Sequence, residues 1–295
     1  MVKHIALISV SVAAISCNQL DVKGLFIPTG ESVEKRFEQS SKMNEGLKSS
    51  CVEVRDSYTF YVAADPHINQ THNNLGRFND SLKNNENASF GVILGDCIDV
   101  KDNMPKYLEA LACNPEEHKF NQPVFHVLGN HDTYFNGWAD YRELVGASVY
   151  WFEAVFEGGK DLYITLDTAN GSLGRMQTQW FKSFLEANRK DYRHCVILTH
   201  TNFFYTDNSQ AGSGNMPFEE SLALIDFLGK QNVSLVLQGH DHYKEDLTYG
   251  NVRYTVLSAI HDSVASPEYL IINVSKDGLE LSWQTVPTHE AVLPI

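Results

Sequence analysis

Short apolar runs recur along the chain from residue 58 onward and alternate with amphipathic stretches. Six runs are rich in Val, Ile, Leu and aromatic residues and are typical of buried strands: Tyr58–Ala64, Phe90–Leu94, Val124–Leu128, Leu162–Leu166, Cys195–Thr199 and Val233–Leu237. Helical patterns lie between them, most clearly at Met176–Lys190 and Phe218–Lys230. Strands that alternate with helices predict an α/β domain.

The pattern changes near the C-terminus. Four further runs are separated by turn sequences, which predicts antiparallel strands joined by hairpins at Lys244–Tyr249, Arg253–Ser258, Tyr269–Val274 and Leu279–Val286. No internal repeat is visible, and no linker divides residues 50–295. We therefore expect one domain over residues 58–295, preceded by an N-terminal extension or linker over residues 18–57.

The first residues form a separate segment. An apolar run over residues 5–15 follows one basic residue; it fits a secretory signal and is too short to span a bilayer. The run ends in Ala-Ile-Ser-Cys, which resembles a bacterial lipoprotein signal, although such signals usually carry Leu where Ala14 stands. We predict a signal segment over residues 1–17, lipidation of Cys17, and an exported protein held on the periplasmic or cell-surface side of a membrane by this N-terminal lipid anchor. Cleavage by an ordinary signal peptidase, or a cytosolic chain with an apolar first strand, are the alternatives.

Charge narrows the classes of partner. The 295 residues include 23 Lys plus Arg and 37 Asp plus Glu, which gives a formal net charge of −14. So acidic a surface repels phosphate backbones, which excludes bulk nucleic-acid binding through a basic face. An anionic substrate would need locally fixed positive charge, such as metal ions. No feature indicates an obligate dimer, and the oligomeric state stays open.

Four cysteines besides Cys17 could form up to two disulfides in an oxidising compartment: Cys51, Cys97, Cys113 and Cys195. We expect at least one bridged pair. Buried free thiols at Cys97 and Cys195, beside predicted strands, are the simpler alternative for those two.

Side chains that bind metals follow five of the six predicted buried strands. In chain order these residues are Asp65, His67, Asp96, Asp99, Asn130, His131, His200, His240 and His242. Because ligands of open α/β sheets bind at the carboxyl ends of the strands, we expect these side chains to converge. Carboxylate, imidazole and amide groups suit Mn, Fe or Zn, and they are too many for one ion. Two ions roughly 3.5–4 Å apart would suit displacement at phosphorus.

The motifs in order are Asp-x-His, Gly-Asp-x-x-Asp, Gly-Asn-His-Asp, a single His at a strand end, and Gly-His-x-His. This set resembles the calcineurin-like metallophosphoesterase superfamily over residues 58 to about 260. The resemblance implies a four-layer αββα sandwich, in which helices flank two mixed β-sheets and a dinuclear metal site lies at the carboxyl ends of the strands.

The resemblance also implies roles for individual residues. The first divalent or trivalent ion would take Asp65, His67 and His242, and the second Asn130, His200 and His240, with Asp96 bridging the two. A metal-bridging hydroxide would attack phosphorus, and His131 would protonate the leaving oxygen. Asp99 matches the position that hydrogen-bonds this histidine. The sequence Cys97-Ile98-Asp99 lacks the metal-binding tyrosine of purple acid phosphatases, which disfavours that branch.

The resulting hypothesis is an enzyme that hydrolyses a small-molecule phosphodiester or phosphomonoester. The alternative is a non-catalytic, metal-containing surface lipoprotein that binds a phosphorylated ligand or a partner. His131 and Asp99 favour the enzyme, because a binding protein needs no proton donor.

For some other residues the sequence alone allows two interpretations. Aromatic residues at 203–205 and at Tyr134, Phe135 and Trp138 could line a substrate site or pack in the core. His261 could lie near the metal edge or simply end a strand.

Overall fold

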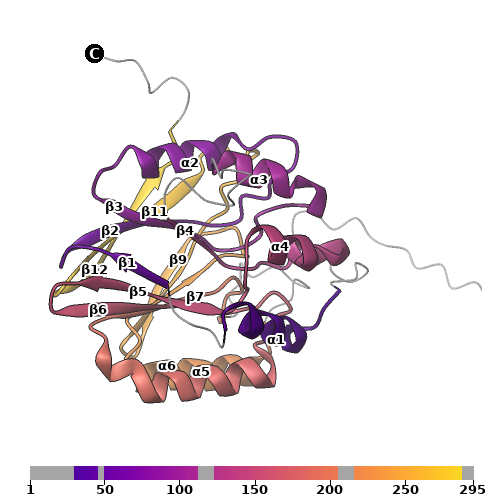
Figure 1. Cartoon of the computed structure of the whole chain (residues 1–295). Helices are drawn as coiled ribbons and strands as arrows, with labels where there is room; N and C mark the ends of the chain where they lie inside the picture. Colours follow the sequence, from indigo (N-terminus) through magenta and orange to yellow (C-terminus); the bar gives the residue numbers. More distant parts are fainter. Residues whose placement is uncertain (1–29, 46–49, 112–122, 205–215, 288–295) are drawn as a thin grey trace, which may run out of the picture.

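Two mixed β-sheets face each other in the computed structural model, which describes residues 30–45, 50–111, 123–204 and 216–287 (Figure 1). The five-stranded sheet has the order β12 (Gly278–Thr285), β11 (Glu268–Ser275), β2 (Tyr58–Ala63), β3 (Ala88–Ile93) and β4 (Val124–His126). The seven-stranded sheet has the order β1 (Ser50–Glu53), β5 (Tyr150–Phe156), β6 (Gly159–Thr165), β7 (Cys195–Leu198), β8 (Leu235–Gln238), β10 (Val252–Val256) and β9 (Glu245–Tyr249).

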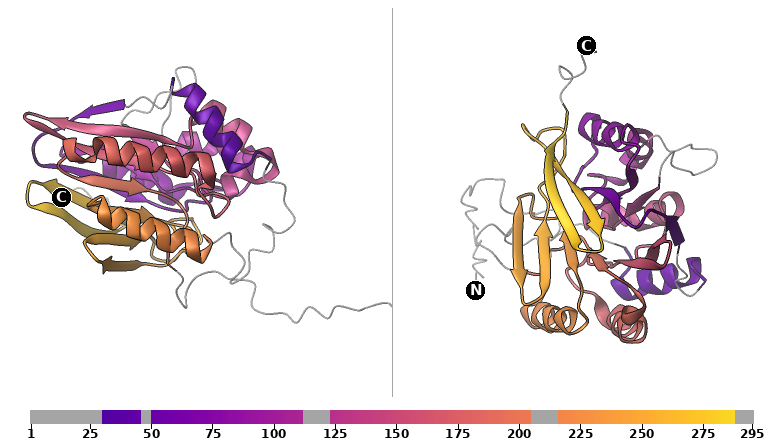
Figure 2. Two further views of the ribbon diagram at one scale, coloured as in Figure 1. Left: turned by 90° about the horizontal axis from the view of Figure 1, so that it is seen from below. Right: turned by 90° about the vertical axis from the view of Figure 1, so that its left-hand side faces the viewer.

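Helices cover the outer face of each sheet. On the five-stranded sheet these are α2 (Asn73–Lys83) and α3 (Met104–Ala110), and on the seven-stranded sheet α5 (Gly174–Asn188) and α6 (Phe218–Lys230) (Figure 1). Figure 2 shows α5 and α6 side by side. The predicted four-layer αββα sandwich is thus confirmed. The remaining helices are α1 (Val33–Met43) and α4 (Trp138–Leu144), with 3-10 turns at η1 (Lys101–Asn103), η2 (His131–Asn136) and η3 (Arg189–Asp191).

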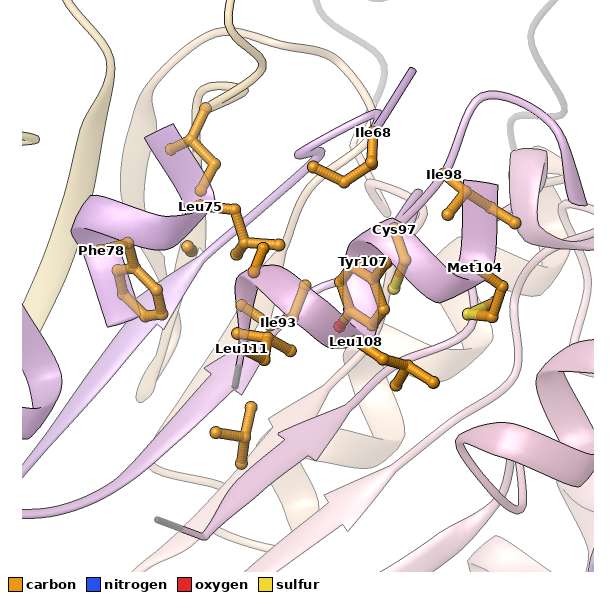
Figure 3. Close-up of a cluster of buried hydrophobic side chains, with 14 of the residues drawn as sticks. Ile68, Leu75, Phe78, Ile93, Cys97, Ile98, Met104, Tyr107, Leu108 and Leu111 are labelled. Carbon is orange, nitrogen blue, oxygen red and sulfur yellow. The ribbon is translucent and has the colours of Figure 1, made fainter. Parts of the chain in front are cut away.

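Three apolar layers hold the sandwich together. The central layer lies between the sheets and contains stacked aromatic rings, such as Phe60 on Phe90 with ring centroids 4.9 Å apart. A second layer joins α2 and α3 to the five-stranded sheet, with Phe78 and Tyr107 fully buried (Figure 3). The third joins α5 and α6 to the seven-stranded sheet. Each sheet is therefore buried on both faces, which explains why its central strands have unbroken apolar sequences.

The predicted strands agree with the structure, including the antiparallel pairs β9–β10 and β11–β12. The sequence analysis did not foresee β1 or β5, which pair with each other in parallel at one edge of the seven-stranded sheet. No disulfide joins any pair of described cysteines, contrary to expectation: Cys51, Cys97 and Cys195 are free thiols, while Cys113 lies outside the described residues. Cys97 and Cys195 are buried in apolar layers, as the simpler alternative had it.

The segment expected to be an extension or linker, residues 18–57, contributes α1 and β1 to the fold in its described part. Arg36 on α1 forms two hydrogen bonds of 2.7 and 2.8 Å with the carboxylate of Asp167, and both side chains are fully buried. Glu34 accepts a hydrogen bond from the backbone N–H of Met176 in the first turn of α5, where a carboxylate opposes the positive end of the helix dipole. These contacts make α1 an integral part of the domain.

Among the described helices, none combines the length and the apolar character needed to cross a bilayer. The predicted signal segment, with Cys17, lies outside the described residues.

Candidate metal centre

The five strand ends meet at one edge of the sandwich, where loops of both sheets are hydrogen-bonded to each other. The backbone N–H of His240, which follows β8, donates to both carboxylate oxygens of Asp65, which follows β2, at 3.1 and 3.0 Å. Nδ1 of His200, which follows β7, lies 2.7 Å from the carbonyl oxygen of Leu94. The predicted convergence of strand ends is therefore present.

One cluster of possible metal ligands consists of Asp65, His67, Asp96 and His242, whose ligand atoms all lie within 4.8 Å of one another. The Nε2 atoms of His67 and His242 are 3.0 Å apart. Nε2 of His242 lies 3.5 Å from Oδ1 of Asp65, and Nε2 of His67 lies 3.5 Å from Oδ2 of Asp96. Two carboxylates and two imidazoles thus point at one small volume.

A second cluster contains Asp96, His200 and His240. Nε2 of His200 lies 3.3 Å from Oδ1 of Asp96, 3.2 Å from Nδ1 of His240 and 3.0 Å from Oδ1 of Asn130. Asp96 belongs to both clusters. The structure thus brings together all seven predicted ligands, in two groups that share the carboxylate expected to bridge.

Neighbouring contacts orient the candidate ligands. A carbonyl oxygen only accepts, so Nδ1 of His200 carries a proton toward Leu94, and Nε2 is the ring nitrogen that faces the cluster. The Asn130 amide donates through Nδ2 to the hydroxyl of Tyr134 at 2.9 Å, which leaves its oxygen on the side of His200. The ligand atoms of His200 and Asn130 are therefore held facing the second cluster.

The loops that carry these side chains have unusual backbone conformations. Five candidate ligands have positive φ angles, namely Asp65 (52°), His67 (42°), Asp96 (48°), His240 (73°) and His242 (60°). Such angles are disfavoured for residues with a Cβ and cluster at functional sites. Glycine is needed at Gly239, where a Cβ would lie 2.6 Å from Oδ2 of Asp65. The chain thus accepts local strain to aim these side chains inward.

The electrostatics around the shared carboxylate of Asp96 favour positive charge. Burial alone would lower the pKa of His200, but the charges of Asp96 and Asp65 outweigh it and raise that pKa to about 10. Burial likewise opposes ionisation of Asp96, yet the facing histidines, His200 foremost, hold its pKa well below the usual range. Buried carboxylates that draw a proton onto a buried imidazole also suit a cation. With oxygen and nitrogen donors, the site fits borderline metals such as Mn, Fe or Zn.

His131 lies beside the first cluster. Its ring packs edge-on against His67, with centroids 4.6 Å apart, and its backbone N–H donates to Oδ1 of Asp96 at 2.9 Å. The buried carboxylate of Asp132 accepts hydrogen bonds from the backbone N–H groups of Gly129 and Ile98, and so holds the turn in place.

Asp99 was expected to hydrogen-bond His131. The structure instead places Oδ1 of Asp99 3.1 Å from Nδ1 of His67 and 3.8 Å from Nδ1 of His131, so the hydrogen bond goes to His67. The reason is local: Nδ2 of Asn69 donates to Oδ2 of Asp99, and the backbone N–H of Asp99 donates to the carbonyl of Ile68. Both contacts tie Asp99 to the loop that carries His67.

Two more residues at this edge were not singled out by the sequence analysis. Asn69 positions Asp99, and Nζ of Lys106 donates to the carbonyl of Asn69 at 2.9 Å. Lys106 therefore places a cation near the site. Since it lies on α3, no motif adjacent to a predicted strand could have revealed it.

Most of the aromatic residues that had two interpretations are buried. Tyr134, Trp138 and Phe203 are almost fully buried, and Phe204 packs against Tyr254 with ring centroids 4.9 Å apart. Only Phe135 of this described set is well exposed. Tyr205 lies outside the described residues.

Clustered His and Asp side chains at the strand ends of a four-layer sandwich form a candidate metal centre. The sequence profile of the calcineurin-like phosphoesterases matches residues 58–244, so the chain belongs to this family. No curated protein matches the chain.

Solved structures agree on the fold. A dimetal phosphatase from Danio rerio has a TM-score of 0.54 and 15% identity, covering 78% of this chain and 99% of that one. Purple acid phosphatase PPD1 from yellow lupin has a TM-score of 0.56 and 13% identity, covering 81% of this chain and 52% of that one. GAP50, the anchor in the inner membrane complex of Plasmodium, has a TM-score of 0.56 and 15% identity, covering 80% and 87%. At such identities the likeness concerns the fold alone.

Proposed function

We propose that the protein hydrolyses a small-molecule phosphoester with two metal ions held by the two clusters. Asp65, His67 and His242 would hold one ion and Asn130, His200 and His240 the other, with Asp96 between them. The observation that carries this proposal is the pair of clusters that share the buried carboxylate of Asp96. When bound, the ions would supply the positive charge that stabilises the phosphoryl oxygens and acidifies an attacking water molecule.

A side chain of the protein would protonate the leaving group. His131 lies beside the first cluster and would donate a proton to the oxygen that leaves phosphorus. Asp99 fixes the tautomer of His67 through the 3.1 Å contact, and its Oδ1 lies 3.8 Å from Nδ1 of His131. The ester could be a diester or a monoester, because the clusters address phosphorus and not its substituents.

We further propose that the protein is exported and anchored through lipidated Cys17. The support is the apolar run over residues 5–15 followed by this cysteine. Cys17→Ser should shift the protein from the detergent phase to the aqueous phase in a Triton X-114 partition. Equal partitioning of the two proteins would contradict lipidation.

The decisive experiment compares the parent with His131→Ala after removal of metal by a chelator and reloading with Mn, Fe or Zn. The substrates are bis(p-nitrophenyl) phosphate and p-nitrophenyl phosphate. Stripped protein should be inactive, and reloading should restore turnover. His131→Ala should lose roughly 10²–10⁴-fold in kcat with unchanged metal content, since general acid catalysis contributes that much. His72→Ala is the control, because His72 is a partly exposed loop residue whose Nε2 lies 3.9 Å from Glu109.

The ratio of the two rates assigns the ester class. A preference for the diester would direct the search to cyclic nucleotides and other diesters, and the opposite preference to phosphomonoesters. Metal-replete parent protein without turnover of either substrate would contradict the proposal and favour a non-catalytic lipoprotein that binds a phosphorylated ligand or partner.

A further inference from the structure

His261 lies beside the first cluster, although no family motif contains it. It follows β10, and its ring centroid is 6.0 Å from that of His67 and 5.9 Å from that of His242. The ring stands nearly perpendicular to His67, at 82°, and the residue is half-buried. An additional imidazole therefore borders two of the proposed ligands of one ion.

The segment that carries His261 is firmly attached on both sides. The backbone N–H of Ile260 donates to the carbonyl of Ala64, the residue before Asp65, at 3.0 Å. The carboxylate of Asp262 accepts hydrogen bonds from the backbone N–H groups of Asn73 and Asn74 at the start of α2, at 3.0 and 2.8 Å. His261 is thus fixed relative to both the first ligand strand and α2, as precise contact with a substrate requires.

A neighbouring hydroxyl engages one of the two ring nitrogens. Oγ of Ser263 lies 2.6 Å from Nδ1 of His261. When the serine hydroxyl donates to Nδ1, the neutral ring carries its proton on Nε2 and can donate there. A phosphoryl oxygen is an acceptor, so this tautomer is the one that suits a phosphoester.

Charge explains why such a donor is useful. The chain has a formal net charge of −14, and the first cluster itself contains two buried carboxylates. An uncharged donor beside the metal ligands can bind a phosphoryl oxygen without adding a second charge to desolvate. His131 is assigned to the leaving oxygen, which leaves the non-bridging oxygens to other donors.

We propose that His261 is a substrate-binding residue that donates a hydrogen bond from Nε2 to a non-bridging oxygen of the phosphoryl group, with Ser263 setting the tautomer. This proposal rests on the proposed function, because it places the phosphoryl group at the two clusters. It adds to that function a residue that binds the phosphoryl group, which diesters and monoesters share. His261 would therefore contribute to the binding of both kinds of ester.

The test uses His261→Phe, which removes both ring nitrogens, and His261→Gln, whose amide nitrogen lies near the position of Nε2. His72→Gln is the matched control in a neighbouring loop. For each metal-loaded protein we would measure metal content, the Kd for inorganic phosphate by calorimetry, and KM and kcat on the better p-nitrophenyl substrate. Loss of one hydrogen bond to a charged group should change the dissociation constant by about 10- to 100-fold.

Three results together would support the proposal. His261→Phe should weaken phosphate binding and raise KM by about 10- to 100-fold. Metal content should not change, and His261→Gln should recover most of the loss. The proposal is overturned if His261→Phe binds phosphate as tightly as the parent. It is also overturned if the loss follows loss of metal and excess metal reverses it, because His261 would then only support the ligands.

The phosphate measurement separates this proposal from the proposed function. A parent that binds phosphate without turnover contradicts the hydrolase, while the affinities of His261→Phe and His261→Gln still decide the role of His261. A metal-replete parent that neither binds phosphate nor turns over substrate overturns both.

Discussion

The buried ion pair between Arg36 and Asp167 allows a quantitative test of the role of α1. Both side chains have no solvent exposure, and the guanidinium makes a third hydrogen bond, from Nη1 to the carbonyl of Glu31 at 2.6 Å. Arg36→Met keeps most of the apolar stem and removes the charge. The carboxylate of Asp167 then stays buried, with the backbone N–H of Ala169 still donating to it at 3.2 Å.

Breaking a buried pair in this way costs about 3–5 kcal/mol of unfolding free energy, because one charge remains desolvated without its partner. For a domain of this size, that corresponds to a fall in Tm of roughly 6–20 °C. The double variant Arg36→Met with Asp167→Asn should be more stable than Arg36→Met alone. The uncharged amide introduced by Asp167→Asn can still accept from the backbone N–H of Ala169 and no longer needs a cation.

The assay is urea unfolding at pH 7, followed by circular dichroism, for the parent, both single variants and the double variant. The interaction free energy from this cycle should be favourable by at least 1–2 kcal/mol, as expected of residues in direct contact. An Arg36→Met variant within about 0.5 kcal/mol of the parent, in the range typical of surface substitutions, would refute the reasoning. It would show that α1 contributes little to the stability of the domain.

Two further predictions concern pH and the site. Burial lowers the pKa of His126 to about 3, so the folded protein keeps it neutral while the unfolded chain takes up a proton below about pH 6.5. The free energy of unfolding should therefore fall as pH drops from 6.5 toward 3. In urea titrations, His126→Asn, which keeps a partner for the hydroxyl of Tyr107, should lose about 2–3 kcal/mol less unfolding free energy than the parent between pH 6.5 and 4.5. Parallel curves of unfolding free energy against pH for the two proteins would contradict this. Gly239→Ala should displace Asp65, because the added Cβ would lie 2.6 Å from Oδ2 of Asp65. Elemental analysis should then find a severalfold lower metal content than in the parent. An unchanged metal content would show that the loop can adjust.

The sequence predicted which side chains gather at this edge because the information it needed is local. Each candidate ligand follows an apolar run directly, and parallel strands bring their carboxyl ends to one edge without any knowledge of long-range packing. The resemblance to a family added the order of the motifs and the sharing of Asp96. The profile match covers residues 58–244, and Asp96 belongs to both clusters.

What the sequence missed depends on contacts between distant segments. Arg36 and Asp167 are 131 residues apart, so no local pattern marks α1 as part of the domain. The spacing of Asp99 correctly placed it near the site, but its hydrogen-bond partner is decided by Asn69, a neighbour of His67. His261 comes near the site because Ile260 is bound to Ala64 and Asp262 to the start of α2.

The division of the clusters between the two sheets has a mechanical consequence. Asp65, His67, Asp96 and Asn130 follow strands of the five-stranded sheet, while His200, His240 and His242 follow strands of the seven-stranded sheet. Neither sheet alone carries all the members of either of these two clusters. An ion bound in either cluster would link the two sheets at that edge. The free energy of metal binding would then include the free energy of packing the two sheets against each other. Metal affinity would then depend on the stability of the packing between the sheets. Substitutions in the central apolar layer could therefore weaken metal binding without changing a ligand.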